Sequence, residues 1–152
     1  MLSDLSFPSG ICLAFAYGSG IFKQKGNVSS DNMLDFVFVL ENAHRWHEEN
    51  LKLHSKHYSF YGWFGSSAVV SLQNKLSAGM YYNTIVPMEG RVIKYGTISR
   101  ENFLRDLNDW QWLYISGRLH KPVKFLQRQR DEDILSALKR NLNSAEIGRA
   151  HV

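Results

Sequence analysis

Two short apolar runs near the start of the chain constrain its fold most. Ile11–Tyr17 (ICLAFAY) and Met33–Leu40 (MLDFVFVL) are rich in aromatic and branched residues and are short for helices, so we expect two buried strands. The first run ends at Gly18-Ser19-Gly20, which predicts a turn, and the polar stretch 23–32 predicts a loop.

The pattern then changes to helices around a hairpin. A polar segment from Asn42 to about Leu53 predicts an exposed helix, and 65–77 predicts a second one. Met80–Val86 and Arg91–Tyr95 predict paired strands joined at 87–90. The second helix is expected to place one set of residues on its apolar face: Ala68, Val69, Leu72 and Leu76.

Two further helices are expected in the C-terminal third. Ser99 is a suitable cap for the first of them, and the second covers about 132–143. Their expected inner faces are Phe103, Leu104, Leu107 and Trp110, and Ile134, Leu135, Leu138 and Leu142. This order of elements predicts an α+β fold, with a small mixed sheet flanked by helices.

Composition narrows the class of protein. A hydrophobic fraction of 44% fits a folded domain, and 152 residues leave little room for a complete second one. Cys12 is the only cysteine, which excludes an internal disulfide and a four-cysteine zinc site. The apolar runs are too short to cross a bilayer, and the first residues lack the character of a secretory signal or mitochondrial presequence. The net charge of +4 suits anionic partners without identifying one.

The turn at Gly18-Ser19-Gly20 and the carboxylate of Asp35 form the first candidate site. Glycines let backbone N–H groups approach phosphate oxygens, and Ser19 adds a hydroxyl donor. Asp35 interrupts an apolar strand, and a buried carboxylate needs a partner or a metal ion. Together they predict a triphosphate site with Mg²⁺ bound by Asp35. The alternatives are an ordinary turn and an aspartate that caps a neighbouring loop.

Basic residues form the second candidate. Lys94 lies in an apolar strand, and Arg118 and Lys121 follow an aromatic stretch, so these cations are candidates for contacts with phosphate oxygens. A lysine that extends from a sheet edge and a solvated loop are equally good interpretations.

Histidines and tryptophans allow other interpretations. His44, His47, His54 and His57 have spacings that permit a zinc site, but a solvated polar helix is the better interpretation. His57-Tyr58-Ser59 ends this segment and could line a pocket. The aromatic side chains are expected mainly in the core. A membrane interface is the alternative for Trp63 beside Phe60, Tyr61 and Phe64, but the core is the better interpretation for these residues too.

Several blocks of this sequence resemble the mitochondrial translocator assembly and maintenance protein family. They keep the order of that family over about residues 13–125. The blocks are Phe15–Gln24 (FAYGSGIFKQ), Leu34–Phe38 (LDFVF), Trp46-His47, Asn50-Leu51, His57-Tyr58-Ser59, Tyr82-Asn83, Ile93–Gly96 (IKYG), Leu104-x-Asp-Leu107 with Trp110, and Tyr114-x-x-Gly-Arg-Leu-x-Lys-Pro-Val123.

The resemblance implies a nucleotidyltransferase fold and a phosphatidate cytidylyltransferase. CTP and phosphatidic acid would give CDP-diacylglycerol and pyrophosphate for cardiolipin synthesis, with Mg²⁺ as cofactor. It further implies peripheral attachment to the matrix side of the mitochondrial inner membrane, and no nucleic-acid partner is expected. Gly18, Ser19 and Gly20 would bind the triphosphate, Asp35 would act as metal ligand, and Lys94, Arg118 and Lys121 would contact phosphates or headgroups. The wider superfamily has two or three carboxylates, for which Asp31, Glu41 and Asp106 are the candidates.

The resemblance also sets the expected domain limits. We expect a nucleotidyltransferase-like domain at 1–125, the start of a helical C-terminal region at 126–145, and a non-native tail at 146–152 that reads like a translated sequencing adapter. Family members continue further, so the rest of the helical region is expected to be missing, and such a chain need not be active. The alternatives are a nucleotidyltransferase acting on RNA or a small molecule, and a non-catalytic membrane or assembly module.

Overall fold

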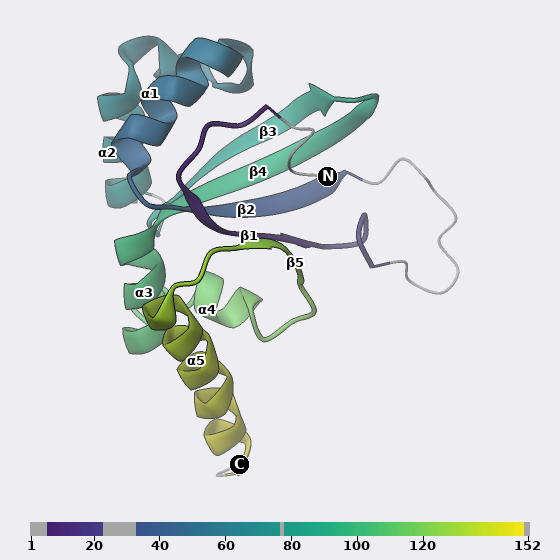
Figure 1. Cartoon of the computed structure of the whole chain (residues 1–152), viewed down its shortest axis with the longest axis vertical. Coiled ribbons are helices and arrows are strands. Elements are labelled where there is room, and N and C mark those ends of the chain that lie inside the picture. Colours follow the sequence, from purple (N-terminus) through teal and green to yellow (C-terminus); the bar gives the residue numbers. More distant parts are fainter. Residues whose placement is uncertain (1–5, 23–32, 77, 151–152) are drawn as a thin grey trace.

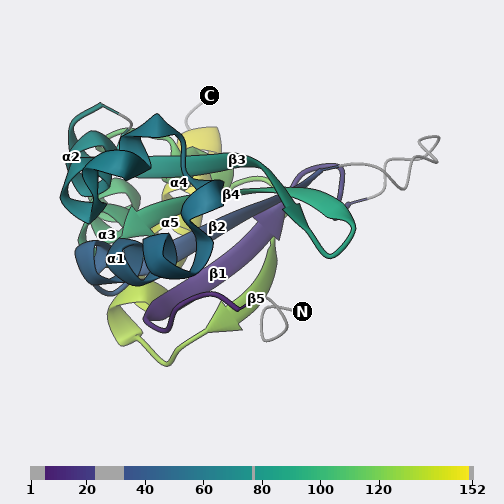
Figure 2. The ribbon, with the colours of Figure 1, turned by 90° about the horizontal axis from the view of Figure 1, so that it is seen from above.

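The computed structural model describes residues 6–22, 33–76 and 78–150. Within these residues the chain forms one sheet of five strands in the order β3-β4-β2-β1-β5 (Figure 2). β2 and β4 are parallel, and the other neighbours are antiparallel. The strands are β1 (Ile11–Tyr17), β2 (Leu34–Leu40), β3 (Met80–Met88), β4 (Arg91–Ser99) and β5 (Lys124–Arg128). The α+β prediction with a small mixed sheet is therefore confirmed.

Helices cover both faces of this sheet (Figure 1). On one side lie α1 (Ala43–His54) and α2 (Ser66–Leu76); on the other lie α3 (Arg100–Asp109), α4 (Ile115–Arg118) and α5 (Glu132–Ala150). Successive side chains of a strand point to opposite faces, so Phe36 and Phe38 pack with the first layer, and Val37 and Val39 with the second. Asp35 has the parity of Val37 and therefore faces the layer of α3, α4 and α5.

The prediction of an exposed helix from Asn42 is wrong for one face of α1. The Asn42 side chain caps the helix by accepting from the Arg45 N–H at 3.0 Å. Trp46, His47 and Asn50 are buried at helical spacing. The polar members of this face tolerate burial because they hydrogen-bond: His47 Nδ1 lies 2.8 Å from the Tyr58 hydroxyl, and Asn50 Nδ2 donates to the same oxygen at 2.8 Å.

Two short 3₁₀ segments, η1 (Ser55–His57) and η2 (Phe60–Phe64), connect α1 to α2. The core prediction is confirmed for Trp46 and wrong for Trp63, which is 87% exposed. Of the face expected for α2, Val69 is fully buried, whereas Ala68 and Leu72 are only partly buried and the Leu76 side chain lies outside the described residues.

The β3–β4 hairpin is longer than its sequence predicts. Both strands extend beyond the expected ends and meet at a tight turn in which Glu89 and Gly90 have positive φ. A register shift between Asn83 and Val86 interrupts β3, and Ile85 adopts φ +57° there. The predicted cap of α3 is confirmed, because the Ser99 hydroxyl accepts from the Asn102 N–H at 3.2 Å.

The helices beyond the hairpin bury a subset of their expected faces. Phe103, Leu107 and Ile134 are buried as predicted, whereas Trp110 is 39% and Leu142 is 51% exposed. Among the α5 side chains that the structure describes, those of Ala137 and Asn141 are the buried ones after Ile134 instead. The helix also runs past its expected end near residue 143, and β5 and α4 had no counterpart in the sequence analysis.

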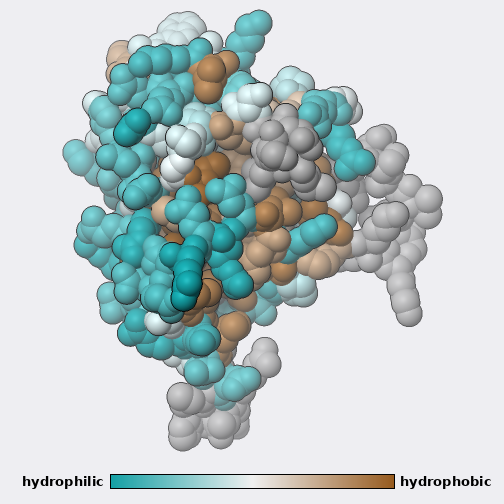
Figure 3. Space-filling model, viewed as in Figure 1, coloured by the Kyte–Doolittle hydropathy of each residue, from teal (hydrophilic) through white to brown (hydrophobic). Residues whose placement is uncertain are grey.

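An apolar cleft of about 240 Å³ lies between β5 and α5. Phe125 and Leu142 line this cleft and are exposed. Figure 3 shows apolar side chains at the surface on this side of the molecule. Across the described part of the chain, no helix has both the length and the apolar character needed to cross a membrane.

Candidate functional site

Strand register brings the predicted metal ligand and the strand lysine together. The Cα partners of Asp35 are Tyr17 on β1 and Lys94 on the parallel strand β4. They lie on the sheet face that α4 covers, beside a cavity of about 600 Å³. Its lining consists of Tyr17, Asp35, Val37, Tyr82, Lys94, Leu113, Tyr114, Ile115, Gly117, Arg118 and Lys121. Four of the predicted site residues therefore line one pocket, although three separate parts of the chain supply them.

The turn after β1 contributes through Gly18. This residue has φ +84°, and a Cβ atom on it would lie 2.9 Å from Asp35 Oδ2, so a larger residue would be strained and would crowd the carboxylate. The Gly18 carbonyl accepts from the Ile21 and Phe22 N–H groups, which closes the turn. Ser19 is exposed on this turn, and none of the three predicted residues Gly18, Ser19 and Gly20 is among the residues that line the pocket.

The pocket combines one half-buried carboxylate with cations. Burial raises the pKa of the Asp35 carboxyl because it disfavours the charged form, and the positive charges of Lys94 and Arg118 oppose this shift. The Lys94 ammonium lies 4.6 Å from the centre of the Tyr82 ring, and the Arg118 guanidinium lies 4.0 Å from that of Tyr17. These rings hold the cations in place by cation–π attraction.

Arg118 has unused hydrogen-bonding capacity. Its Nε is buried and has no partner within the described residues. A buried donor without an acceptor is unfavourable, so a ligand oxygen in the pocket would relieve this cost. Arg118 is therefore the residue whose environment points most directly to an anionic ligand.

Tyrosines are the part of the site that the sequence analysis missed. The Tyr82 hydroxyl donates to that of Tyr114 at 3.0 Å, and Tyr17 lies under Arg118. Burial is the largest of the effects that raise the pKa of Tyr17 and Tyr82, so both phenols are neutral at neutral pH. Tyr17 directly precedes the glycine turn, and that position was an available signal.

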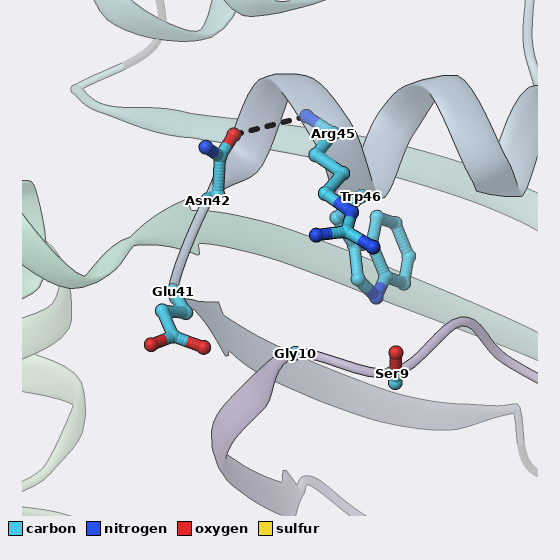
Figure 4. A pocket seen from close by; sticks show the side chains of 6 residues that line it. All are labelled: Ser9, Gly10, Glu41, Asn42, Arg45 and Trp46. Atoms are coloured by element: carbon cyan, nitrogen blue, oxygen red, sulfur yellow. Dashed lines mark hydrogen bonds between the residues drawn. The ribbon is translucent and has the colours of Figure 1, made fainter.

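The other candidate carboxylates do not join Asp35. Asp106 is buried, and its two oxygens accept from the N–H groups of Trp112, Leu113, Ile115 and Ser116 at 2.8–2.9 Å. Glu41 follows the far end of β2, about 20 Å from Asp35 at the usual strand rise. Figure 4 shows it beside Gly10, in a different pocket. Asp31 lies outside the described residues.

A divalent cation would therefore have one protein carboxylate in this pocket. The described residues contain no cluster of three or more His, Cys, Asp or Glu side chains suited to a metal ion. A single carboxylate nevertheless fits Mg²⁺, which is often bound through one or two carboxylates, substrate phosphates and water. The missing side chain at Gly18 leaves Asp35 Oδ2 accessible to such an ion.

The histidines belong to a different part of the molecule. His47 is fully buried, so the interpretation of a solvated helix is wrong for this residue, and its Nε2 lies 3.1 Å from Gln73 Oε1. His54 and His57 stack with ring centres 4.5 Å apart, and His57 Nδ1 lies 3.0 Å from the Tyr95 hydroxyl. These contacts form a polar network under α1 and not a wall of the pocket around Asp35.

Comparison with known proteins identifies the family. The family model described as "Phosphatidate cytidylyltransferase, mitochondrial" matches residues 2–147. Curated proteins of the same name are 49% identical in Xenopus laevis, 47% in Homo sapiens and 40% in Schizosaccharomyces pombe, each over 91% of this chain. The matches cover 42%, 31% and 35% of these relatives, so the chain spans less than half their length. The chain therefore belongs to the mitochondrial phosphatidate cytidylyltransferase family.

Proposed function

We propose that this protein acts as a phosphatidate cytidylyltransferase. It would transfer CMP from CTP to phosphatidic acid and release pyrophosphate, and the CDP-diacylglycerol formed would serve cardiolipin synthesis. Family membership supports the reaction. The observation that carries the proposal for these residues is the meeting of Asp35, Lys94 and Arg118 in one pocket.

The proposed fold type is that of a nucleotidyltransferase. Its support is local: a glycine-serine turn follows β1, and the neighbouring strand β2 presents Asp35 next to that turn. In such an arrangement the turn binds the triphosphate and the carboxylate binds a metal ion.

The turn after β1 and the charged residues of the pocket then have separate roles. Gly18, Ser19 and Gly20 would hold the triphosphate with backbone and hydroxyl donors. Asp35 would hold Mg²⁺, which, when bound, offsets charge on the phosphate oxygens. Lys94, Arg118 and Lys121 would contact phosphates of the two substrates, and the unpaired Nε of Arg118 would gain its acceptor.

The chemistry needs positioning and charge more than proton transfer. A phosphate oxygen of phosphatidate attacks the α-phosphorus of CTP and forms the new P–O bond. The bond to the bridging oxygen between the α- and β-phosphates breaks, and pyrophosphate leaves with those electrons. Because the nucleophile is already an anion, no strong general base is needed, and the cations reduce the repulsion between the two substrates.

The location follows from the substrate. Phosphatidate lies in a membrane, and the relatives are named as mitochondrial. We propose that the protein is peripheral and lies on the matrix side of the inner membrane, as the family resemblance implies.

Radiolabelled CTP tests the function directly. Phosphatidate vesicles, Mg²⁺ and the protein should yield labelled CDP-diacylglycerol, and Asp35→Asn should lower the rate at least a hundredfold. Glu41→Gln, which changes a carboxylate outside the pocket, is the matched control and should keep the parent rate. Transfer of label to RNA or a soluble alcohol but not to phosphatidate would refute the lipid substrate. Vesicle binding by Asp35→Asn, with no nucleotide binding by the parent, would favour a non-catalytic membrane module.

A further inference from the structure

The segment 110–118 supplies much of the pocket wall, although most of it lies outside regular structure. Leu113, Tyr114 and Arg118 are among its lining residues. Trp110 and Leu113 have φ of +52° and +57°, which residues other than glycine rarely adopt. Such backbone persists only where the surroundings hold it firmly.

The Asp106 carboxylate holds the middle of the segment. Oδ1 accepts from the Trp112 N–H at 2.8 Å and from the Leu113 N–H at 2.9 Å. Oδ2 accepts from the Ile115 and Ser116 N–H groups, both at 2.9 Å. A carboxylate has about four acceptor sites, and four backbone N–H groups of the segment occupy those of Asp106. Asp106 therefore shapes the pocket without entering it.

Asn141 holds both ends of the same segment from α5. Its side chain is fully buried. Oδ1 accepts from Trp110 Nε1 at 3.0 Å, and Nδ2 donates to the Ser116 carbonyl at 3.0 Å. Two buried side chains from two helices thus fix the segment that ends at Arg118.

We propose that Asp106 and Asn141 are positioning residues for the phosphate site. They hold the strained backbone before α4 so that Arg118 lies over Tyr17, with its Nε available to a ligand oxygen. This inference rests on the proposed function, because that function identifies the anion bound by Arg118 as the triphosphate of CTP. Neither residue contacts that anion in this arrangement, and their effect on affinity passes through Arg118.

A double-mutant cycle tests this route. Asp106→Asn keeps the shape of the side chain but turns an amide NH₂ towards N–H donors. It should weaken binding of CTP with Mg²⁺ at least tenfold in the parent, as measured by isothermal titration calorimetry. In an Arg118→Ala background the same change should weaken binding less than twofold, because the group that it positions is gone.

Asp131→Asn is the matched control. Asp131 also accepts backbone N–H bonds, from Asp133 and Ile134, and pairs with Arg100, but the described structure puts it outside the pocket lining. This change should lower thermal stability and leave CTP affinity unchanged. If Asp106→Asn does not fold, Asn141→Leu carries the same cycle.

The outcomes separate this inference from the proposed function. Equal losses in both backgrounds, or no loss in the parent, would overturn the positioning role. A parent that binds pyrophosphate but not CTP would refute the proposed function, and the cycle run with pyrophosphate would still decide the positioning role. A parent that binds neither overturns both.

Discussion

Acid should destabilise the folded protein through His47. This side chain is fully buried, and burial lowers its pKa from the ordinary 6.5 to about 4. The unfolded chain therefore binds a proton near pH 6.5, whereas the folded protein binds it only near pH 4. The contribution of neutral His47 to the free energy of unfolding is fully present above pH 6.5. It falls as the pH drops below that value and is lost below pH 4.

The pKa values of His47 in the unfolded and folded protein determine how much unfolding free energy is lost in acid. Lowering the pKa of His47 from 6.5 to about 4 corresponds to about 3 kcal/mol of unfolding free energy in full, of which about 2 kcal/mol is lost by pH 5. His57 also has a pKa lowered to about 4, but it is only half-buried, so solvent screening makes its share smaller.

Urea unfolding followed by tryptophan fluorescence at pH 7 and pH 5 measures the loss. His47→Gln should be less stable than the parent at pH 7, and its own loss between the two pH values should be smaller by about 2 kcal/mol. His44→Gln, on the exposed face of the same helix, should keep most of the loss seen in the parent. If the parent and His47→Gln lose the same free energy of unfolding between pH 7 and pH 5, the argument from burial is wrong.

Three further changes test the site and the core. Gly18→Ala should lower the melting temperature and weaken CTP binding, because the added Cβ would crowd Asp35 Oδ2 and the backbone φ is positive. Unchanged CTP binding would show that the close contact between Gly18 and Asp35 is not needed for binding. Tyr17→Leu should weaken CTP binding by about 2- to 30-fold through loss of about 0.5–2 kcal/mol of cation–π attraction with Arg118, whereas Tyr17→Phe should stay near the parent. Phe103→Ala should cost about 3–5 kcal/mol in urea unfolding, since the ring is fully buried, and a loss under 1 kcal/mol would contradict the packing described.

Local patterns predicted the strands and the residues that interrupt them. Apolar runs identified β1 and β2. Asp35 and Lys94 each interrupt an apolar strand, and this marked the two residues as candidates for the functional site. The sequence could not predict that Asp35 and Lys94 lie side by side, because the parallel pairing of β2 with β4 joins residues that are 59 positions apart (94 − 35). A register slip of one residue would have put Asp35 on the other face. The roles assigned to the site residues stay predictions, as do the limits at residues 125 and 145.

The errors arose where tertiary contacts override composition. His47 and Asn50 read as solvent-facing, but both are buried and hydrogen-bond to side chains from other elements, His47 to Gln73 and Asn50 to Tyr95. Trp63 reads as a core residue, yet the short η2 segment leaves it exposed. β5 is a five-residue strand in which four side chains, Phe125 included, are exposed and Leu126 is partly buried, so it lacks the alternation that identifies strands.

The order of the strands has a consequence for the behaviour of the protein in solution. β3 and β5 form the two edges of the described sheet, and an edge strand offers unpaired backbone groups to other chains. The irregular step at Ile85 and the proline at position 87 interrupt one edge. Lys124 and Arg128 put charge on the other, which is also short. Both edges thus resist pairing with a neighbouring molecule, and the strands that carry Asp35 and Lys94 remain in the interior of the sheet.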